Sequence, residues 1–460
     1  MGKPDKIRKW NNISPASFIL LGFALVILAG SLILMLPVCS AEGTFTPYID
    51  ALFTATTSVC VTGLVTVSTA FHWSFFGQLV ILILIQLGGM GIVALLILIL
   101  TLLHRRIGMK NRILIQQTYG LETMKGVVRF LLRIIRGMLM MELVGFLLYL
   151  PVFCSDFGLA GIWKSLFLSI SAFCNAGMDV LGDTSLAAYA DNWWVNLVTM
   201  ALIILGGLGF MVWWEMEDVI ASWLRREKSA GALLKRLSLH AKIVLSATLF
   251  LIIFGSLVVF FAEYHNPMTL GPMSFPKKCM AALFQSVTTR TAGFYTVNQT
   301  GFTDTSSLTC MLLMFIGGSP AGTAGGIKTM TVAILIAAVL SEIWGRDKVV
   351  AFKRTISSGY VRKALTIAGF SFAVWIFLTL LLCMVEELDF MKLCYETVSA
   401  IGTVGLSKDL TGLLHTPGKA VIICLMYAGR IGPVTLASAF LTREKSDSMI
   451  HYADETVLLG

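Results

Sequence analysis

Eight stretches of about 20 or more mostly apolar residues run through this sequence of 460 residues. About 20 apolar residues match the roughly 30 Å hydrocarbon core of a bilayer, and one soluble core cannot hold eight such segments. Only 13% of the residues are charged. The sequence therefore predicts an all-α integral membrane protein with transmembrane helices over 18–36, 75–103, 127–150, 193–214, 243–261, 308–343, 365–385 and 420–441.

Basic residues cluster before the first apolar stretch and in alternate connections, and positive charge favours the cytoplasmic side. The clusters lie at 3–9, 104–112, 225–236, 346–363 and 443–445. Both termini are therefore predicted to be cytoplasmic, and the net charge of +9 reflects topology rather than nucleic-acid binding. The nine cysteines include no C-x-x-C pair, so they indicate neither a disulfide framework nor a metal site.

An internal repeat organises the chain. Between spans one and two, three and four, five and six, and seven and eight, a short apolar and hydroxyl-rich stretch ends in a glycine, and these glycines recur at intervals of 114, 116 and 112 residues. A fixed period is typical of repeated structural units. The predicted organisation is a cytoplasmic N-terminus (1–12), four repeats (13–110, 111–228, 229–345 and 346–446) and a cytoplasmic tail (447–460).

Each short stretch is too short to span a bilayer, which favours a half-helix that enters the membrane and returns as extended backbone. Extended backbone must avoid lipid, and four copies around one pseudo-fourfold axis would form a pore. Rings of backbone carbonyls can replace the water around a monovalent cation such as potassium. The predicted selectivity-filter residues are Val61, Thr62, Gly63 and Leu64; Asn175, Ala176, Gly177 and Met178; Thr291, Ala292, Gly293 and Phe294; and Thr403, Val404, Gly405 and Leu406.

A second glycine cluster follows each loop inside the next span, at 88–91, 206–209, 317–318 and 429–432. Close helix packing explains such clusters as well as a special backbone geometry does. In the sixth span, small residues and one proline from 317 to 327 predict a broken or deformed helix. This segment is similar to a phosphate-binding loop, but no strand precedes it, so nucleotide binding is disfavoured.

These loops, together with segments 316–329 and 429–433 and the tail 452–460, resemble the Trk/Ktr/HKT superfamily of cation transporters, in particular its KtrB-like membrane subunits. The resemblance covers nearly the whole chain and implies gated, channel-like potassium uptake across the plasma membrane. In that superfamily four loop glycines imply potassium selectivity. The implied gate is an intramembrane loop with an arginine beside it: Gly317, Gly318, Ser319, Pro320, Ala321, Gly322, Thr323, Ala324, Gly325, Gly326, Lys328 and Arg430.

The same resemblance implies a homodimer in the bilayer, resting on a separate KtrA-like octameric cytosolic ring of RCK subunits. ATP or ADP is then expected on the ring, and the chain itself is expected to carry no cofactor except potassium as its cargo. The polar tail from Asp447 to Gly460 contains Tyr452 and a Val-Leu-Leu run suited to docking on such a partner, or else is a frayed terminus.

Three charged residues near the loops invite specific roles. Arg290 and Glu396 suggest an ion pair that supports the filter from behind, and Asp179 suggests a charge that concentrates cations at the mouth. A sodium-selective or cation-coupled carrier of the same fold is the alternative function. An intramembrane enzyme is disfavoured because no H-E-x-x-H motif occurs and no histidine accompanies Ser319.

Overall fold

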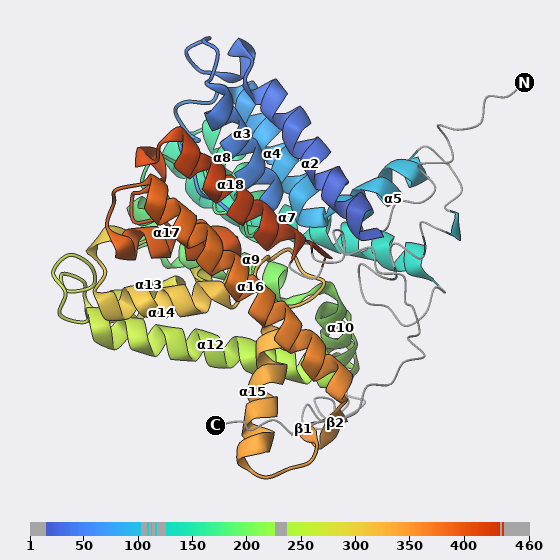
Figure 1. Cartoon of the computed structure of the whole chain (residues 1–460). Helices are drawn as coiled ribbons and strands as arrows, with labels where there is room; N and C mark the ends of the chain where they lie inside the picture. Colours follow the sequence, from blue (N-terminus) through green and yellow to red (C-terminus); the bar gives the residue numbers. More distant parts are fainter. Residues whose placement is uncertain are drawn as a thin grey trace, which may run out of the picture.

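The computed structural model describes residues 15–102, 126–225 and 237–432, with isolated positions at 108, 109, 112, 116, 435 and 436. In this part of the chain, four helices are individually long and apolar enough to cross a bilayer. They are α2 (Pro15–Leu34), α7 (Val127–Phe157), α12 (Leu239–Glu263) and α16 (Ser358–Val385). Each opens one of the four predicted repeats (Figure 1). The tail from Asp447 to Gly460 lies outside the described residues.

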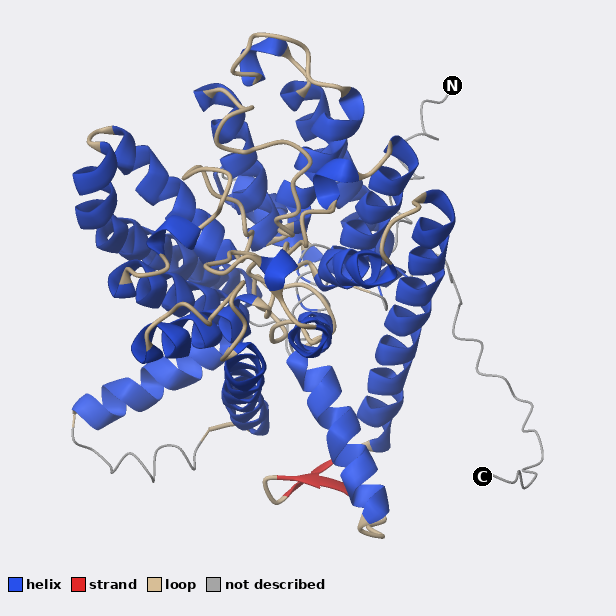
Figure 2. Ribbon diagram, turned by 90° about the vertical axis from the view of Figure 1, so that its left-hand side faces the viewer, coloured by secondary structure: helices blue, strands red, loops and turns tan. Residues whose placement is uncertain are grey.

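A short helix follows each long one, as the repeat pattern predicts. These pore helices are α3 (Tyr48–Cys60), α8 (Ala160–Cys174), α13 (Phe275–Thr288) and α17 (Phe390–Gly402). All four lead into a residue with left-handed backbone two positions before the loop glycine, with φ between 51° and 75°. This geometry ends α3, α8 and α17, whereas α13 ends three residues before its left-handed residue. Figure 2 shows several loops gathered in the middle of the bundle.

The second helix is broken rather than continuous in the first three repeats. Gly91 separates α4 (Phe75–Met90) from α5 (Ile92–Leu102), and Gly209 separates α9 (Trp193–Leu208) from α10 (Phe210–Leu224) with a bend of 109°. A loop separates α14 (Asp304–Phe315) from α15 (Thr329–Ile343), and α18 (Thr416–Ile431) ends at Gly432. The predicted continuous spans 75–103 and 193–214 are therefore wrong in detail, because Gly91 and Gly209 adopt φ values of 80° and 86°.

The second glycine clusters serve both close helix packing and a special backbone geometry, at different positions. Gly88, Gly206 and Gly429 have no side chain because each lies against a pore-helix carbonyl, of Val59, Phe173 and Ile401 respectively, where a Cβ would collide. Three residues later, a glycine with positive φ ends the helix. Different glycines of one cluster therefore allow close packing and end the helix.

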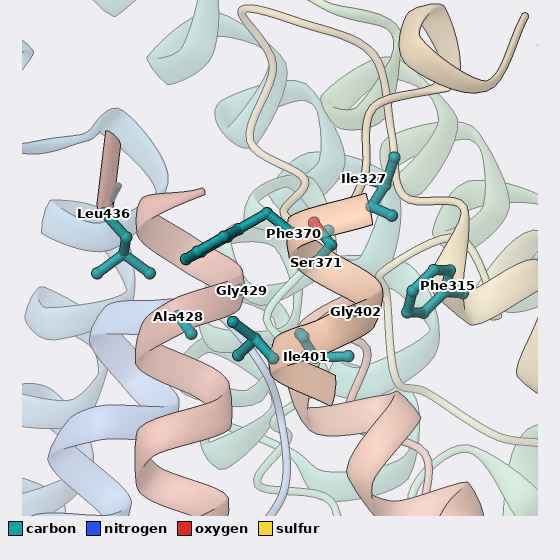
Figure 3. Close-up of a pocket in the computed structure, with 11 residues that line it drawn as sticks. Phe315, Ile327, Phe370, Ser371, Ile401, Gly402, Ala428, Gly429 and Leu436 are labelled. Atoms are coloured by element: carbon teal, nitrogen blue, oxygen red, sulfur yellow. The ribbon is translucent and has the colours of Figure 1, made fainter. Parts of the chain in front are cut away.

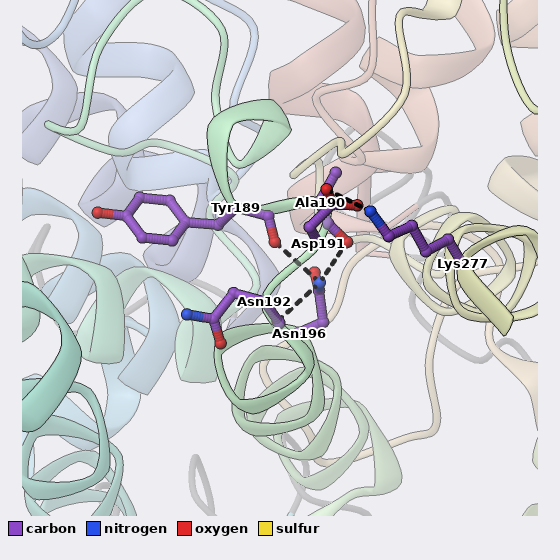
Figure 4. A network of polar contacts seen from close by, with 6 residues as sticks. All are labelled: Tyr189, Ala190, Asp191, Asn192, Asn196 and Lys277. Atoms are coloured by element: carbon purple, nitrogen blue, oxygen red, sulfur yellow. Dashed lines mark hydrogen bonds and ion pairs between the residues drawn. The ribbon is translucent and has the colours of Figure 1, made fainter. Parts of the chain in front are cut away.

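The repeats close into a ring. The second helix of each repeat contacts the pore helix of the next: α4 contacts α8, α9 contacts α13, α14 contacts α17, and α18 returns to α3. On the surface, Lys277 at the start of α13 donates a hydrogen bond to Asp191 at 2.6 Å (Figure 4). The side-chain amide of Asn196 donates to the carbonyl oxygens of Tyr189 and Ala190, in the same loop as Asp191.

The remaining elements are short. Within the described residues, 3-10 turns cover Pro37–Cys39, Ala187–Tyr189, Gln299–Gly301 and Thr411–Leu413. Strands β1 (Val349–Ala351) and β2 (Arg354–Ile356) form an antiparallel hairpin between α15 and α16, with Val349 paired to Ile356. This hairpin is a small addition to the predicted all-helical fold, and Phe352 and Lys353 close it with left-handed backbone.

Candidate cation pathway and gate

The four loop glycines meet at one constriction. A Cβ added to Gly63 would lie 2.7 Å from the carbonyl oxygen of Ala176, and one added to Gly177 would lie 2.6 Å from that of Ala292. In the same way, Gly293 faces the carbonyl oxygen of Val404, and Gly405 faces that of Thr62. Each glycine therefore abuts the carbonyl that precedes the glycine of the next loop, in closed cyclic order.

Each filter loop contributes four predicted residues, hereafter a tetrad, and their roles in the structure differ by position within the tetrad. The first residues, Val61, Asn175, Thr291 and Thr403, all have left-handed backbone; three of them cap their pore helices, and Thr291 lies three residues after the end of α13. The second residues, Thr62, Ala176, Ala292 and Val404, supply the carbonyl oxygens of the ring. The residues after the glycines, Leu64, Met178, Phe294 and Leu406, are at most 1% exposed and belong to the hydrophobic core. Side chains therefore hold the loops from behind while backbone oxygens line the constriction.

Hydroxyl groups fasten each loop to its own pore helix. The backbone N–H of Gly63 donates to Thr57 Oγ1 at 2.9 Å, and that of Gly405 donates to Ser399 Oγ at 3.0 Å. Ser171 bonds the backbone of Met178, and Thr288 donates to the carbonyl of Phe294 at 2.6 Å. These residues were not singled out from sequence, although the hydroxyl six residues before the glycine recurs in three repeats.

A cavity of about 320 Å³ opens on one side of the ring, which we call the mouth. All four glycines border it, together with Asp179, Asp183, Asp409 and Tyr295. Asp179 is 8% exposed and accepts a hydrogen bond from the backbone N–H of Leu181 at 3.0 Å. Burial raises the pKa of the Asp179 carboxyl to about 6, although the backbone hydrogen bonds it accepts oppose this shift.

The loop between α14 and α15 (317–328, hereafter the gate loop) crosses the opposite side of the ring. The N–H groups of Ser319 and Thr323 donate to the carbonyls of Gly207 and Gly206 at 2.8 and 3.1 Å, where α9 breaks. The Thr323 hydroxyl donates to the Phe173 carbonyl, at the end of α8. Gly325 abuts the side chain of Thr403, so the gate loop lies directly against the filter.

Two basic side chains hold the gate loop. Arg430, in the last turn of α18, donates from its two terminal nitrogens to the carbonyl oxygens of Thr323 and of Gly88. Lys328 donates to the carbonyl oxygen of Ala324 at 2.6 Å. The predicted place of Arg430 beside the loop is confirmed by these contacts. The forked guanidinium of Arg430 therefore connects the gate loop to the end of α4, and this connection opposes displacement of the loop.

The gate loop itself is small and internally bonded. Gly317 N–H donates to the Ile327 carbonyl at 2.8 Å, and Thr329 N–H donates to the Gly318 carbonyl at 3.0 Å, which closes the loop at its neck. The Ser319 and Thr329 hydroxyls lie 3.0 Å apart. Beside Gly326 and Ile327 is a mostly apolar cavity of about 20 Å³ between α14, α16, α17 and α18 (Figure 3), which is roughly the room for one water molecule.

The suggested ion pair between Arg290 and Glu396 does not form. Glu396 accepts hydrogen bonds from the hydroxyls of Ser407, at 2.6 Å, and of Thr411. Arg290 instead borders a small cavity with Ile204, Gly207 and other residues of α9, α12 and α13. The expectation failed because charge complementarity was inferred from two different repeats, whereas the hydroxyls that bind Glu396 come from its own loop.

A bundle of apolar helices that encloses a ring of backbone carbonyls is typical of multi-pass membrane transport proteins. The chain belongs to the TrkH family of cation transport proteins, whose family model matches residues 14–452.

Relatives match along almost the full length. The chain is 38% identical to the potassium/sodium uptake protein NtpJ of Enterococcus hirae, over 99% of each chain. It is 37% identical to the Ktr system potassium uptake protein B of Bacillus subtilis, also over 99% of each chain. The crystal structure of the potassium transporter TrkH from Vibrio parahaemolyticus matches with a TM-score of 0.72 at 18% identity, covering 94% of this chain and 86% of that one. The similarity to this crystal structure establishes the fold.

Proposed function

We propose that this protein carries potassium ions across the plasma membrane through the ring of filter carbonyls, with the gate loop as its barrier. The observation that carries the proposal is the closed cyclic contact of the four glycines with the carbonyls of the neighbouring loops. A ring of carbonyl dipoles without carboxylates suits a monovalent cation, whereas calcium or magnesium favours several carboxylate oxygens. The names of the relatives support potassium as cargo.

Sodium transport is the second candidate, because one relative is named a potassium/sodium uptake protein. The four tetrads also differ from one another, so the carbonyl ring has no exact fourfold symmetry. Uptake of a potassium tracer into proteoliposomes, with sodium as competitor and then with the labels exchanged, separates the two. We expect potassium to be preferred. Flux of sodium alone would refute the potassium assignment while leaving cation transport intact.

The Asp179 carboxylate is expected to raise the local cation concentration at the mouth. A carboxyl with a pKa of about 6 is charged above that pH and neutral below it, so its attraction is present at neutral pH and lost in acid. Acidifying the mouth side from pH about 7.5 to about 5 should reduce flux at low potassium concentration by up to about fivefold, given a Coulomb energy near 1 kcal/mol. Asp179→Asn should show the reduced flux at every pH.

The control for this measurement is Glu42→Gln, because Glu42 is exposed and does not border the mouth cavity. It should keep both the flux and its pH dependence. If Asp179→Asn retained the full acid response, other groups would be responsible for it, and the role of Asp179 would be rejected.

The remaining parts of the proposal concern assembly. A homodimer with both termini in the cytoplasm, resting on an RCK-type ring that binds ATP or ADP, fits the word "system" in the names of three relatives. A nucleotide can control flux only if the ring binds the open and closed pathway with different affinity. Reconstitution with the ring should therefore give flux that differs between ATP and ADP. Equal flux in both nucleotides, with the ring shown to be attached, would reject this regulation.

A further inference from the structure

A buried polar cluster joins the third and fourth repeats behind the filter. Gln285 of α13 and Gln299, just after the third loop, exchange two side-chain hydrogen bonds of 2.9 and 3.0 Å. The hydroxyl of Tyr395 in α17 donates to the same Gln299 oxygen at 2.9 Å. The exposed fractions of these three side chains are 0–2%. We call Gln285, Gln299 and Tyr395 the brace.

The brace is tied to backbone and side chains on both sides. The Gln299 amide also donates to the carbonyl oxygen of Val297, in the segment that follows the third filter loop. Lys408, three residues after Gly405, lies over the Tyr395 ring at 5.6 Å and donates to Ser307 of α14 at 2.6 Å. The cluster therefore links the segment behind one filter loop to the pore helix and the segment behind the next.

The position of Tyr395 distinguishes the fourth repeat from the others. Ten residues before the filter glycine, the other three pore helices carry Phe53, Phe167 and Leu283, which have no polar group. A phenylalanine at this position is thus compatible with the pore-helix packing of two repeats. The hydroxyl of Tyr395 adds a contact between repeats, since its partner Gln299 belongs to the third.

The brace acts where two filter loops meet. Gly293 of the third loop abuts the carbonyl of Val404 in the fourth, and its added Cβ would lie 3.2 Å from the Cα of Gly405. Discrimination between two monovalent cations by carbonyls depends on how many oxygens surround the ion and how far apart they are held. A buried cluster of hydrogen bonds that links two adjacent pore helices through Gln299 can control this separation without touching the ion.

We propose that the hydrogen bond between Tyr395 and Gln299 is a specificity-determining contact, which sets the spacing of the third and fourth filter loops and so the preference for potassium over sodium. This inference rests on the proposed function. Tyr395 and Gln299 are positioning residues, because they act through the carbonyls of the loops. Loss of the hydroxyl relaxes one side of the ring and favours adaptation to the smaller ion.

The test is Tyr395→Phe, with the preference measured by competition between potassium and sodium in proteoliposomes. We expect a fall in the preference of about fivefold, equivalent to roughly 1 kcal/mol, with potassium flux in the absence of sodium largely kept. Tyr149→Phe is the matched control, because the buried Tyr149 hydroxyl bonds Thr199 at 2.7 Å between α7 and α9, outside the brace. It should leave the preference unchanged even if it lowers thermal stability.

A double variant separates the brace from general packing. If Tyr395 and Gln299 act through one hydrogen bond, Gln299→Leu combined with Tyr395→Phe should change the preference less than the sum of the single effects. A wild-type protein without potassium preference would reject the proposed function itself. A selective wild type with an unchanged Tyr395→Phe variant would reject the brace, and so would an equal loss of preference in Tyr149→Phe.

Discussion

Serine at any one of the four filter glycines is expected to reduce the preference for potassium over sodium by about tenfold or more. Gly63, Gly177, Gly293 and Gly405 all have positive φ, between 66° and 99°, where an L side chain is strained by about 1–2 kcal/mol. The new Cβ would also collide with the carbonyl of the next loop, 2.6–2.7 Å away for Gly177 and Gly63 and closer for the other two. A change of 1.4 kcal/mol in relative ion binding is already tenfold.

The order of the four effects is also expected. An added Cβ at Gly293 or Gly405 makes the closer collision, so these two variants should lose more preference than Gly63→Ser and Gly177→Ser. The measurement is potassium uptake under sodium competition, normalised to the amount of folded protein in the membrane. This ordering follows from the geometry of the ring and is not available from the tetrad sequences.

Gly43→Ser is the matched control for these variants. Gly43 has a φ of 71°, and nothing lies within 4 Å of an added Cβ. It therefore carries the same backbone strain without a filter carbonyl nearby, and its preference should equal that of the wild type. If Gly43→Ser lost as much preference as the filter variants, strain and instability would explain the effect. Unchanged preference in all four filter variants would remove these loops from the ion pathway.

The sequence was enough to predict the repeats and the pore helices, because both depend on local pattern. Apolar length specified the membrane segments, and the glycine period specified the loops. The breaks at Gly91 and Gly209 were harder to predict, since a glycine inside an apolar helix serves either close packing or a change of backbone direction. The structure separates the two roles by the sign of φ, which is positive at Gly91 and Gly209 but not at Gly88 and Gly206.

Contacts between repeats were the part that sequence could not supply. The Arg290 and Glu396 pair was suggested by charge alone, whereas hydroxyls of Ser407 and Thr411 bind Glu396. The hydrogen bond from Tyr395 to Gln299 joins residues 96 positions apart in the chain. The pairing of Tyr395 with Gln299 has no local signature, because the order in which the repeats close around the axis decides which side chains meet.

Deletion of Ser319 to Gly325 is expected to raise flux strongly, because it removes the segment that crosses the pathway beneath the filter. The deleted residues carry the contacts to Gly206, Gly207 and Phe173. The two ends of the shortened loop remain held together, because the hydrogen bond from Gly317 N–H to the Ile327 carbonyl lies outside the deletion. The measurement is initial uptake of a potassium tracer per folded molecule.

A point variant tests the same barrier with less disturbance. Arg430→Gln removes the charged fork between the carbonyls of Thr323 and Gly88 while keeping a side chain that can bond one of them. A hydrogen bond to a charged group contributes about 1.5–3 kcal/mol, so losing one such bond should raise the open population by at least about tenfold. Flux should increase in this variant, though less than in the deletion. Ser256→Ala serves as a control, since its hydroxyl bonds only the Ile252 carbonyl within α12, away from the gate loop.

The two variants together decide between a gate and a structural loop. A barrier that blocks ions predicts higher flux in both variants, with the potassium preference retained because the filter carbonyls are untouched. A loop that only stabilises the fold predicts lower flux in both, with a parallel loss of thermal stability. Higher flux accompanied by lost preference would mean that the gate loop supports the filter through its contact with Thr403, so that the barrier and the selective ring would be one coupled unit.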